Sequence, residues 1–139
     1  MLFNSLLKHS KIPKIIEIWI FNNSGLLLLN ARNSRIKKFQ KIDPLLFSGM
    51  LAAMEFLSKK RLNHIAMNDL QLILLPVIKP FPLFLVASTY RYVSSRRVRN
   101  VLQEIYEEFS AEFQEILPYW SGNLSIFSYF QEKIINKYF

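Results

Sequence analysis

The segment Ile15–Ala31 constrains the fold more than any other part of the chain, because it is apolar on both faces. It reads IIEIWIFNNSGLLLLNA, which is two apolar runs separated by Asn22-Asn23-Ser24-Gly25. These turn residues tolerate tight chain reversals, so the segment predicts a β-hairpin. Alternation along the first strand places Ile16, Ile18 and Ile20 on one face and Ile15, Trp19 and Phe21 on the other, with Glu17 as the polar interruption. A strand that is apolar on both faces must be covered on both, which predicts a sheet between helices.

The composition is typical of a single folded domain in a reducing compartment. A chain of 139 residues can bury a core of its own, and a hydrophobic fraction of 51% excludes a disordered tail. The absence of cysteine excludes a disulfide scaffold and a thiolate metal site, and it fits the cytoplasm. Residues 1–11 are too short and too polar for a secretory signal, so we interpret them as an N-terminal extension of one domain over residues 1–139.

The apolar region Leu70–Thr89 predicts two strands and a turn rather than a membrane span. Pro76, Lys79, Pro80 and Pro82 interrupt it, whereas a spanning helix needs roughly 20 uninterrupted apolar residues. Leu83–Ala87 is apolar on both faces, like the opening strand, so these two strands are expected to form the central pair. Pro76 cannot donate a ladder hydrogen bond, and a bulge or a strand end is expected there.

Helices and an edge strand complete the expected order. Asp43-Pro44 is typical of a helix start, with an N-cap acceptor before proline at the first helical position. Ser94 or Ser95 is expected to cap the longest helix, which Pro118 ends. The expected elements after the hairpin are a helix over 44–60, strands over 62–68, 70–78 and 83–89, a helix to about residue 117, and a last helix after Gly122.

This order resembles the longin domain and, more broadly, the longin/roadblock group of profilin-like folds. Three segments carry the resemblance: IWIFNNSGLLLLNA as the hairpin, DPLLFSGMLAAMEFL as the first helix, and YWSGNLSIFSYF at the last junction. The resemblance implies an α+β fold with one five-stranded antiparallel sheet of order 2-1-5-4-3. One helix would cover one face and two C-terminal helices the other. Two helices after the last strand favour the longin branch over minimal roadblock proteins.

The resemblance also implies a function, because longin-like proteins are typically non-enzymatic platforms for small GTPases and parts of trafficking adaptors. We therefore expect a scaffold that dimerises and binds a small GTPase, a longin/roadblock-type partner or a vesicle-trafficking complex, without a cofactor. A homodimer and a heterodimer stay equally open. The expected location is the cytoplasm, with peripheral contact on the cytosolic face of a membrane.

The sequence offers little support for catalysis. General acid–base chemistry needs carboxylates or histidines placed together, and His9 and His64 are isolated. There is no Gly-rich phosphate loop, no GxSxG motif and no paired metal-ligand spacing. We interpret His64 as a histidine of a sheet edge or surface. A buried cluster of Glu17, His64 and Glu55 is the arrangement that would favour an enzyme.

The charge is distributed unevenly along the chain. Residues 1–99 hold sixteen Lys and Arg against four Asp and Glu, while residues 100–139 hold two against six, for a net charge of +8. The expected topology brings the positive residues to one end of the sheet, which we call the basic end. Its predicted members are Arg32, Arg35, Lys37, Lys38, Lys41, Arg91, Arg96, Arg97 and Arg99, beside Lys11 and Lys14.

The long helix shows an unusual charge order. Three arginines, Arg96, Arg97 and Arg99, occupy its first turns, where the helix dipole favours anions. This arrangement favours binding of phosphate, anionic lipid or an acidic partner loop. The alternative is that the basic start of the helix only contacts water. Glu104, Glu108 and Glu112 repel one another at i, i+4 spacing. They face either a basic partner or water, and we favour water.

The first helix has more apolar surface than one sheet face needs. Methionine suits adaptable contacts, so a protein interface is expected there. Its predicted residues are Phe47, Met50, Leu51, Met54 and Phe56. The alternative is that the terminal helix or the segment Leu2–Leu7 covers the excess.

One further function class stays open. A sequence pI of 9.8 and the arginine cluster also fit a basic nucleic-acid-binding module. Only Tyr90 and Tyr92 interleave with the basic end, and no DNA or RNA motif is present. Nucleic acid is therefore the alternative partner and not the expected one.

Overall fold

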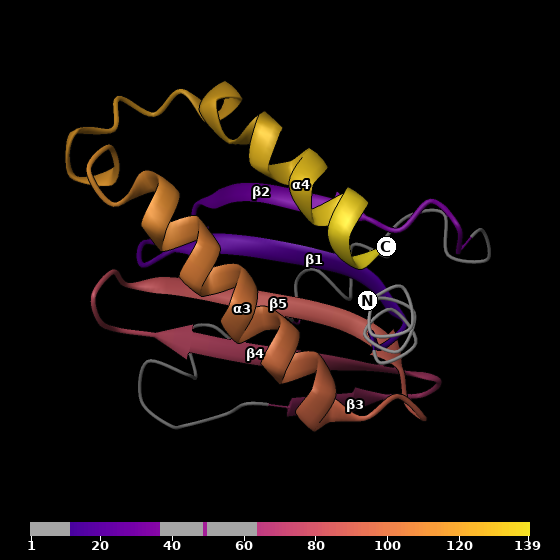
Figure 1. Ribbon diagram of the computed structural model, residues 1–139. Helices are drawn as coiled ribbons and strands as arrows, with labels where there is room; N and C mark the ends of the chain where they lie inside the picture. Colours follow the sequence, from indigo (N-terminus) through magenta and orange to yellow (C-terminus); the bar gives the residue numbers. More distant parts are fainter. Residues whose placement is uncertain (1–11, 37–48, 50–63) are drawn as a thin grey trace, which may run out of the picture.

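Five antiparallel strands form one sheet in the order β2-β1-β5-β4-β3, which confirms the predicted topology and the α+β class (Figure 1). The computed structural model describes residues 12–36, 49 and 64–139. Within them the strands are β1 (Ile15–Asn22), β2 (Leu27–Arg32), β3 (His64–Met67), β4 (Leu70–Val77) and β5 (Leu83–Tyr90). The two strands that are apolar on both faces, β1 and β5, lie side by side in the centre, as predicted.

The predicted turn joins β1 to β2. The side-chain Oδ1 of Asn22 accepts hydrogen bonds from the backbone N of Ser24 (3.0 Å) and of Leu26 (2.9 Å). Gly25 has a φ of 86°, a left-handed conformation that glycine adopts without strain. Asparagine and glycine therefore close this hairpin for the reasons that the sequence indicated.

The side chains of β1 alternate between the two faces of the sheet as predicted, except at Ile15. Ile18 and Ile20 belong to one buried cluster and Trp19 and Phe21 to the other, as predicted. Ile15 was expected beside Trp19, and this is wrong, because it packs with Ile18 and Ile20. The reason is a shift in the β1–β5 register between Ile15 and Glu17, where an additional residue changes the alternation.

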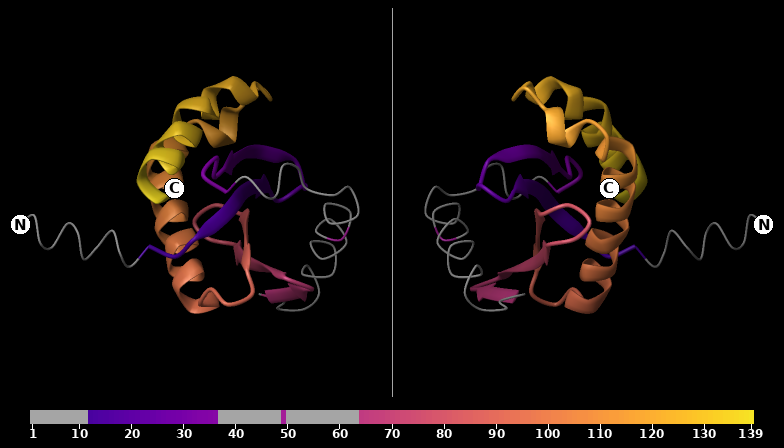
Figure 2. Two further views of the ribbon diagram at one scale, coloured as in Figure 1. Left: turned by 90° about the vertical axis from the view of Figure 1, so that its right-hand side faces the viewer. Right: turned by 90° about the vertical axis from the view of Figure 1, so that its left-hand side faces the viewer.

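One face of the sheet is covered by the C-terminal helices. These are α3 (Ser95–Phe113), the short 3-10 turns η1 (Leu117–Tyr119) and η2 (Leu124–Phe127), and α4 (Ser128–Tyr138). Figures 1 and 2 show α3 and α4 on the same side of the sheet. Val98, Leu102 and Ile105 of α3 pack into the cluster that contains Ile18 and Leu85. The prediction of two C-terminal helices on one face is confirmed.

Aromatic rings fill the space between α3 and α4. Phe109 of α3 lies 5.5 Å from Phe127 and 5.2 Å from Phe130, measured between ring centroids. Phe113 lies 5.0 Å from Phe127, and Trp120 of the connection lies 5.5 Å from the same ring. The four phenylalanines are buried, so α4 is anchored to α3 through a shared apolar core.

The second face of the sheet is also buried. Trp19, Phe21, Leu72, Leu74, Phe84 and Val86 form its cluster, with Ile65 packed against it. The helix predicted over residues 44–60 and its cap Asp43 lie outside the described residues, apart from the helical position 49. The central inference, that water is excluded from both faces of the central strands, is thus confirmed.

Two element boundaries differ from prediction, and both involve proline. Pro76 lies inside β4 opposite Phe84 without a register shift, so the expected bulge is absent and β4 ends one residue later. Among the described residues β3 pairs only with residues 70–73 of β4. No hydrogen bond toward β3 is therefore needed at position 76, and proline, which has no backbone N–H, is tolerated there. The long helix ends at Phe113 and not near residue 117, because the ring of Pro118 clashes with the carbonyl of Gln114 in an α-helix.

None of the helices in the described ranges combines the length and the apolar character that crossing a bilayer requires.

Candidate functional site

Strand pairing brings seven of the described cationic residues to one end of the sheet. Glu17, near the start of β1, is paired with Arg32 at the end of β2 and with Ser88 near the end of β5. The residues that follow β2 and β5 therefore leave the sheet at the same end. The described members of the basic end are Lys14, Arg32, Arg35, Arg91, Arg96, Arg97 and Arg99. Lys11, Lys37, Lys38 and Lys41 lie outside the described residues.

The basic end consists of two groups that lie on either side of β1. Arg32 and Arg35 form the β2 group, at the border of the sheet that β2 provides. Arg91, Arg96 and Arg97 form the β5–α3 group, in the turn after β5 and the first turn of α3. Figure 1 shows the chain after β2 and the turn after β5 at the right-hand end, the first above and the second below, with α3 starting farther toward the middle. The described segments of the basic end thus leave the sheet at the same end, on either side of β1, and their forming one binding surface stays a prediction.

A buried glutamine holds the turn that carries the β5–α3 group. Gln71 of β4 has its Nε2 at 2.7 Å from the backbone O of Val93 and at 3.2 Å from that of Tyr90. The same Nε2 lies 3.1 Å from Thr89 Oγ1. A buried amide must find hydrogen-bond partners, and here they are the backbone of the turn itself. Gln71 therefore fixes where α3 starts relative to the sheet.

Further contacts order the same turn. The backbone N of Arg91 donates to Asp69 O at 3.0 Å, and its Nη1 donates to Asn68 O at 3.2 Å. Ser94 caps α3 by accepting from Arg97 N at 3.3 Å, which confirms one of the two predicted caps. Arg91, Arg96 and Arg97 are exposed. The turn thus presents three charged side chains from an ordered backbone.

The β2 group stands beside a buried acid. Asn30 Nδ2 donates to Glu17 Oε2 at 2.9 Å, and Glu17 is 6% exposed. Burial raises the pKa of Glu17 above its ordinary value, while the hydrogen bond from Asn30 and the charge of Arg32 act in the opposite direction. Asn33 orders the following turn, since its Nδ2 donates to Ile15 O at 3.0 Å and its Oδ1 accepts from Arg35 N at 3.1 Å. Arg32 is half-buried, so Arg35 is the exposed cation of this group.

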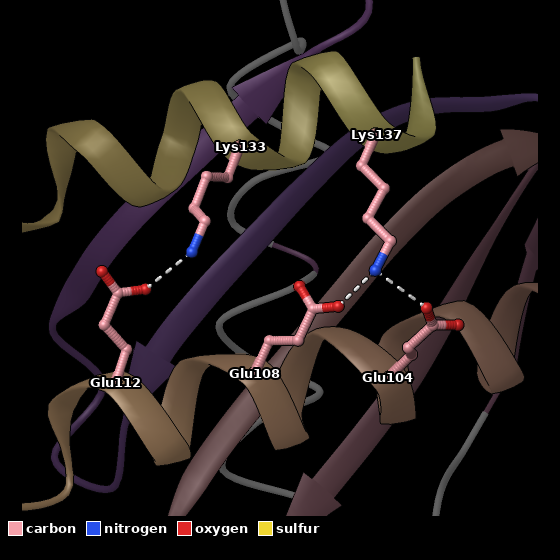
Figure 3. Close-up of polar contacts among 5 residues, drawn as sticks. All are labelled: Glu104, Glu108, Glu112, Lys133 and Lys137. Atoms are coloured by element: carbon pink, nitrogen blue, oxygen red, sulfur yellow. Dashed lines mark hydrogen bonds and ion pairs between the residues drawn. The ribbon is translucent and has the colours of Figure 1, made fainter.

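The glutamates of α3 face lysines of the same chain, which corrects the expectation that they face water or a partner (Figure 3). Lys137 of α4 pairs with Glu108 and, at 3.1 Å, with Glu104. Lys133 pairs with Glu112 at 3.3 Å. Hydrogen bonding to Glu108 is the main cause that raises the pKa of Lys137. The sequence interpretation failed because the two lysines lie more than twenty residues away, on a helix whose facing the repeat of glutamates does not reveal.

The candidate acid–base cluster is not assembled among the described residues. His64 is exposed on β3, and its Nε2 lies 2.7 Å from Gln71 Oε1. β5 and β4 separate it from Glu17 on β1, and Glu55 lies outside the described residues. The described residues also contain no group of three or more His, Cys, Asp or Glu side chains that could hold a metal ion. His64 is a sheet-edge residue, as interpreted from the sequence.

The sequence did not point to Gln71, it pointed to Tyr92 only in part, and one predicted surface stays untested. Gln71 could have been noticed as the polar residue within the apolar run LQLILL. Tyr92 was noticed only as an aromatic within the basic end, and its exposure could not be read from the sequence. The predicted interface residues Phe47, Met50, Leu51, Met54 and Phe56 lie outside the described residues.

The sheet order and the helices on its face are those that the resemblance implied for a longin/roadblock-like fold. No protein-family model matches the sequence, and no curated protein matches it. Among solved structures the chain is similar to MglC from Myxococcus xanthus, with 14% identity and a TM-score of 0.49 over 78% of this chain and 98% of that one. A likeness at this level carries no argument about function, which therefore has to come from the site.

Proposed function

We propose that this chain is a non-catalytic, longin-type scaffold that dimerises and binds a small GTPase or a trafficking-type complex at a membrane surface. The observation that carries the proposal is the exposed β5–α3 group on an ordered turn of a longin/roadblock-like sheet. Its basic end contacts anionic lipid or an acidic partner, since each Arg or Lys near an anionic leaflet contributes about 1 kcal/mol of attraction. The protein acts in the cytoplasm and peripherally on the cytosolic face of a membrane.

The contacts of five described acids support a scaffold over an enzyme. Glu104, Glu108 and Glu112 pair with the lysines of α4, and Glu17 accepts from Asn30. Asp69 belongs to the β3–β4 turn that binds Arg91 through its backbone. General acid–base catalysis needs a carboxylate or histidine that is free to exchange protons with a substrate. The named acids instead make contacts within the chain.

The dimer part of the proposal rests on the first helix. Phe47, Met50, Leu51, Met54 and Phe56 are the proposed contact residues, because their apolar surface exceeds one core stripe. Met50→Glu and Met54→Glu should shift a dimer to a monomer in sedimentation velocity, with Lys79→Gln as a surface control. A dimer that persists unchanged in both glutamate variants would refute this surface.

Vesicle binding tests the membrane part directly. The parent protein should bind phosphatidylserine-containing vesicles at low salt and lose binding as salt shortens the Debye length from about 30 Å to about 8 Å. Arg96→Gln/Arg97→Gln should bind about thirtyfold more weakly, and Lys79→Gln in the β4–β5 turn should match the parent. Equal binding to neutral and anionic vesicles would refute the proposed binding to an anionic membrane.

Partner identity is tested by co-purification from the native cell followed by mass spectrometry. A small GTPase or a longin/roadblock-type protein should be enriched with the parent, and the complex should form again from the two purified proteins. Failure of the purified pair to bind would refute the partner class.

A basic nucleic-acid-binding module is the alternative, and the exposed Tyr92 beside arginines is the observation that favours it. Filter binding of single-stranded and duplex DNA and RNA across salt concentrations distinguishes the two functions. Retention at low salt that depends on Arg96 and Arg97 would support the alternative, and no retention would discard it.

A further inference from the structure

Tyr92 is a large, exposed aromatic side chain at the basic end. It lies in the turn between β5 and α3 and is 78% exposed. The other large apolar side chains that are exposed among the described residues come from the β1–β2 turn, the β4–β5 turn, the α3–α4 connection and the start of α4. They are Leu26, Ile78, Ile116, Tyr119, Leu124 and Tyr129. Within the described part of the basic end, Tyr92 is therefore the only large apolar side chain that is exposed.

The Tyr92 ring is held in place before any ligand arrives. It stacks on Tyr90 with ring centroids 5.6 Å apart and an angle of 8° between the planes. The backbone on either side is fixed, because Val93 N donates to Tyr90 O at 3.1 Å and Gln71 donates to both carbonyls of that turn. An ordered side chain loses little conformational entropy on binding.

The charges around Tyr92 define the chemistry of a ligand. Arg91 precedes it, and Arg96 and Arg97 follow within five residues, all exposed. Asp69, whose backbone binds Arg91, is the opposing charge in the neighbouring turn. The balance is positive, so this surface attracts an anionic one. Tyrosine combines an apolar ring with a polar hydroxyl, and such side chains prefer the headgroup level of a bilayer.

We propose that Tyr92 is an interfacial anchor, whose ring enters the headgroup region of an anionic bilayer while Arg91, Arg96 and Arg97 contact lipid phosphates. This inference rests on the proposed membrane binding and adds the residue that orients the protein on the surface. The turn between β5 and α3 then faces the membrane, and the β1–β2 and β4–β5 turns, which lie at the opposite end of the sheet in Figure 1, face away from it.

The test separates the apolar contribution from the electrostatic one. Tyr92→Ser should bind phosphatidylserine-containing vesicles about eightfold more weakly than the parent, as expected when about 50 Å² of apolar surface is no longer transferred from water. Its salt dependence should equal that of the parent, because burial of a ring is not screened. Arg96→Gln/Arg97→Gln should instead bind about thirtyfold more weakly and show a shallower salt dependence. Tyr119→Ser is the matched control, since Tyr119 is 89% exposed in the α3–α4 connection and should not matter.

A fluorescent variant locates the ring in the bilayer. Tyr92→Trp should gain a blue-shifted emission and quenching by brominated lipid on anionic vesicles, and Tyr119→Trp should gain neither. If Tyr92→Ser binds vesicles like the parent while the arginine variant does not, the anchor is refuted and the proposed membrane binding stands. If the parent protein does not bind anionic vesicles, both the anchor and the proposed membrane binding are refuted. If Tyr92 and the arginines are needed for single-stranded RNA but not for vesicles, the ring is a base-stacking residue and the anchor is likewise refuted.

Discussion

Replacing Phe130 with alanine tests whether buried rings, and not the lysine–glutamate pairs, hold α4 on the protein. Phe130 is fully buried and lies 5.2 Å from Phe109 and 5.9 Å from Phe113 between ring centroids. Removing a buried phenylalanine ring destabilises a protein by about 3–5 kcal/mol, because apolar contacts are lost and a cavity remains. Phe130→Ala should lower the free energy of unfolding by about 4 kcal/mol, and Phe130→Leu by about 1 kcal/mol.

The pairs of Lys137 are expected to contribute far less. The side chain of Lys137 is 46% exposed, and those of Glu104 and Glu108 are 47% and 35% exposed. Exposed ion pairs contribute about 0.2–1 kcal/mol, since water and salt screen them. Lys137→Gln should therefore lower the free energy of unfolding by less than about 1 kcal/mol. The raised pKa of Lys137 means that its contribution to stability is complete below the ordinary value of 10.5, including neutral pH, and is lost only as pH rises through the raised pKa.

Urea denaturation followed by tryptophan fluorescence measures all three variants on one scale. Trp120 lies 5.5 Å from Phe127 between ring centroids and reports on the contact between α3 and α4. If Lys137→Gln destabilises the protein as much as Phe130→Ala does, the buried rings are not what holds α4 in place. A loss of several kcal/mol in the stability of the parent protein at molar salt would refute the same claim.

Three further changes test the polar contacts. Gln71→Leu should lower the free energy of unfolding by about 2–3 kcal/mol, because it removes the Gln71 donor from the Val93 carbonyl and one of the donors from the Tyr90 carbonyl, and a loss below about 0.5 kcal/mol would contradict that role. Tyr106→Phe should lower it by about 1–2 kcal/mol, since the hydroxyl of Tyr106 both donates to Phe81 O and accepts from Phe81 N at 3.1 Å, and unchanged urea denaturation would argue against these bonds. Glu17 has a raised pKa in the folded state, so its stabilising contribution is complete below the unfolded value of 4.5 and is lost as pH rises through the folded value. The stability of Glu17→Gln relative to the parent should therefore increase from acidic to neutral pH, and a constant difference would refute this sign.

The central sheet could be predicted because burial on two faces leaves a clear trace in sequence. The runs around Trp19 and Val86 are apolar at almost every position, which only a strand covered on both faces requires. The turn at Asn22 and the cap at Ser94 follow from local hydrogen bonding, so neighbouring residues suffice to predict them. Strand order then followed from the family resemblance together with the burial of β1 and β5.

The missed features depend on contacts between distant segments. Glu112 and Lys133 are separated by twenty-one residues, and nothing near either residue indicates the other. The Gln71 contacts join β4 to the turn after β5 over more than twenty residues. The division of the basic end into two groups depends on which strand is the edge and where α3 starts. Such features require the packed structure, because side-chain periodicity describes one element at a time.

The irregularity near the start of β1 sets a constraint on any redesign of this strand. The additional residue, Ile16, places Ile15 on the same face as Ile18, whereas regular alternation through residue 16 would place Ile15 on the face of Trp19. Excising Ile16 would bring Ile15 directly before Glu17 and opposite Thr89, where regular alternation keeps Ile15 on the face of Ile18 and toward the helices. A redesign that imposes a regular register should therefore delete Ile16, because a regular register that retains this residue would turn Ile15 away from the helices.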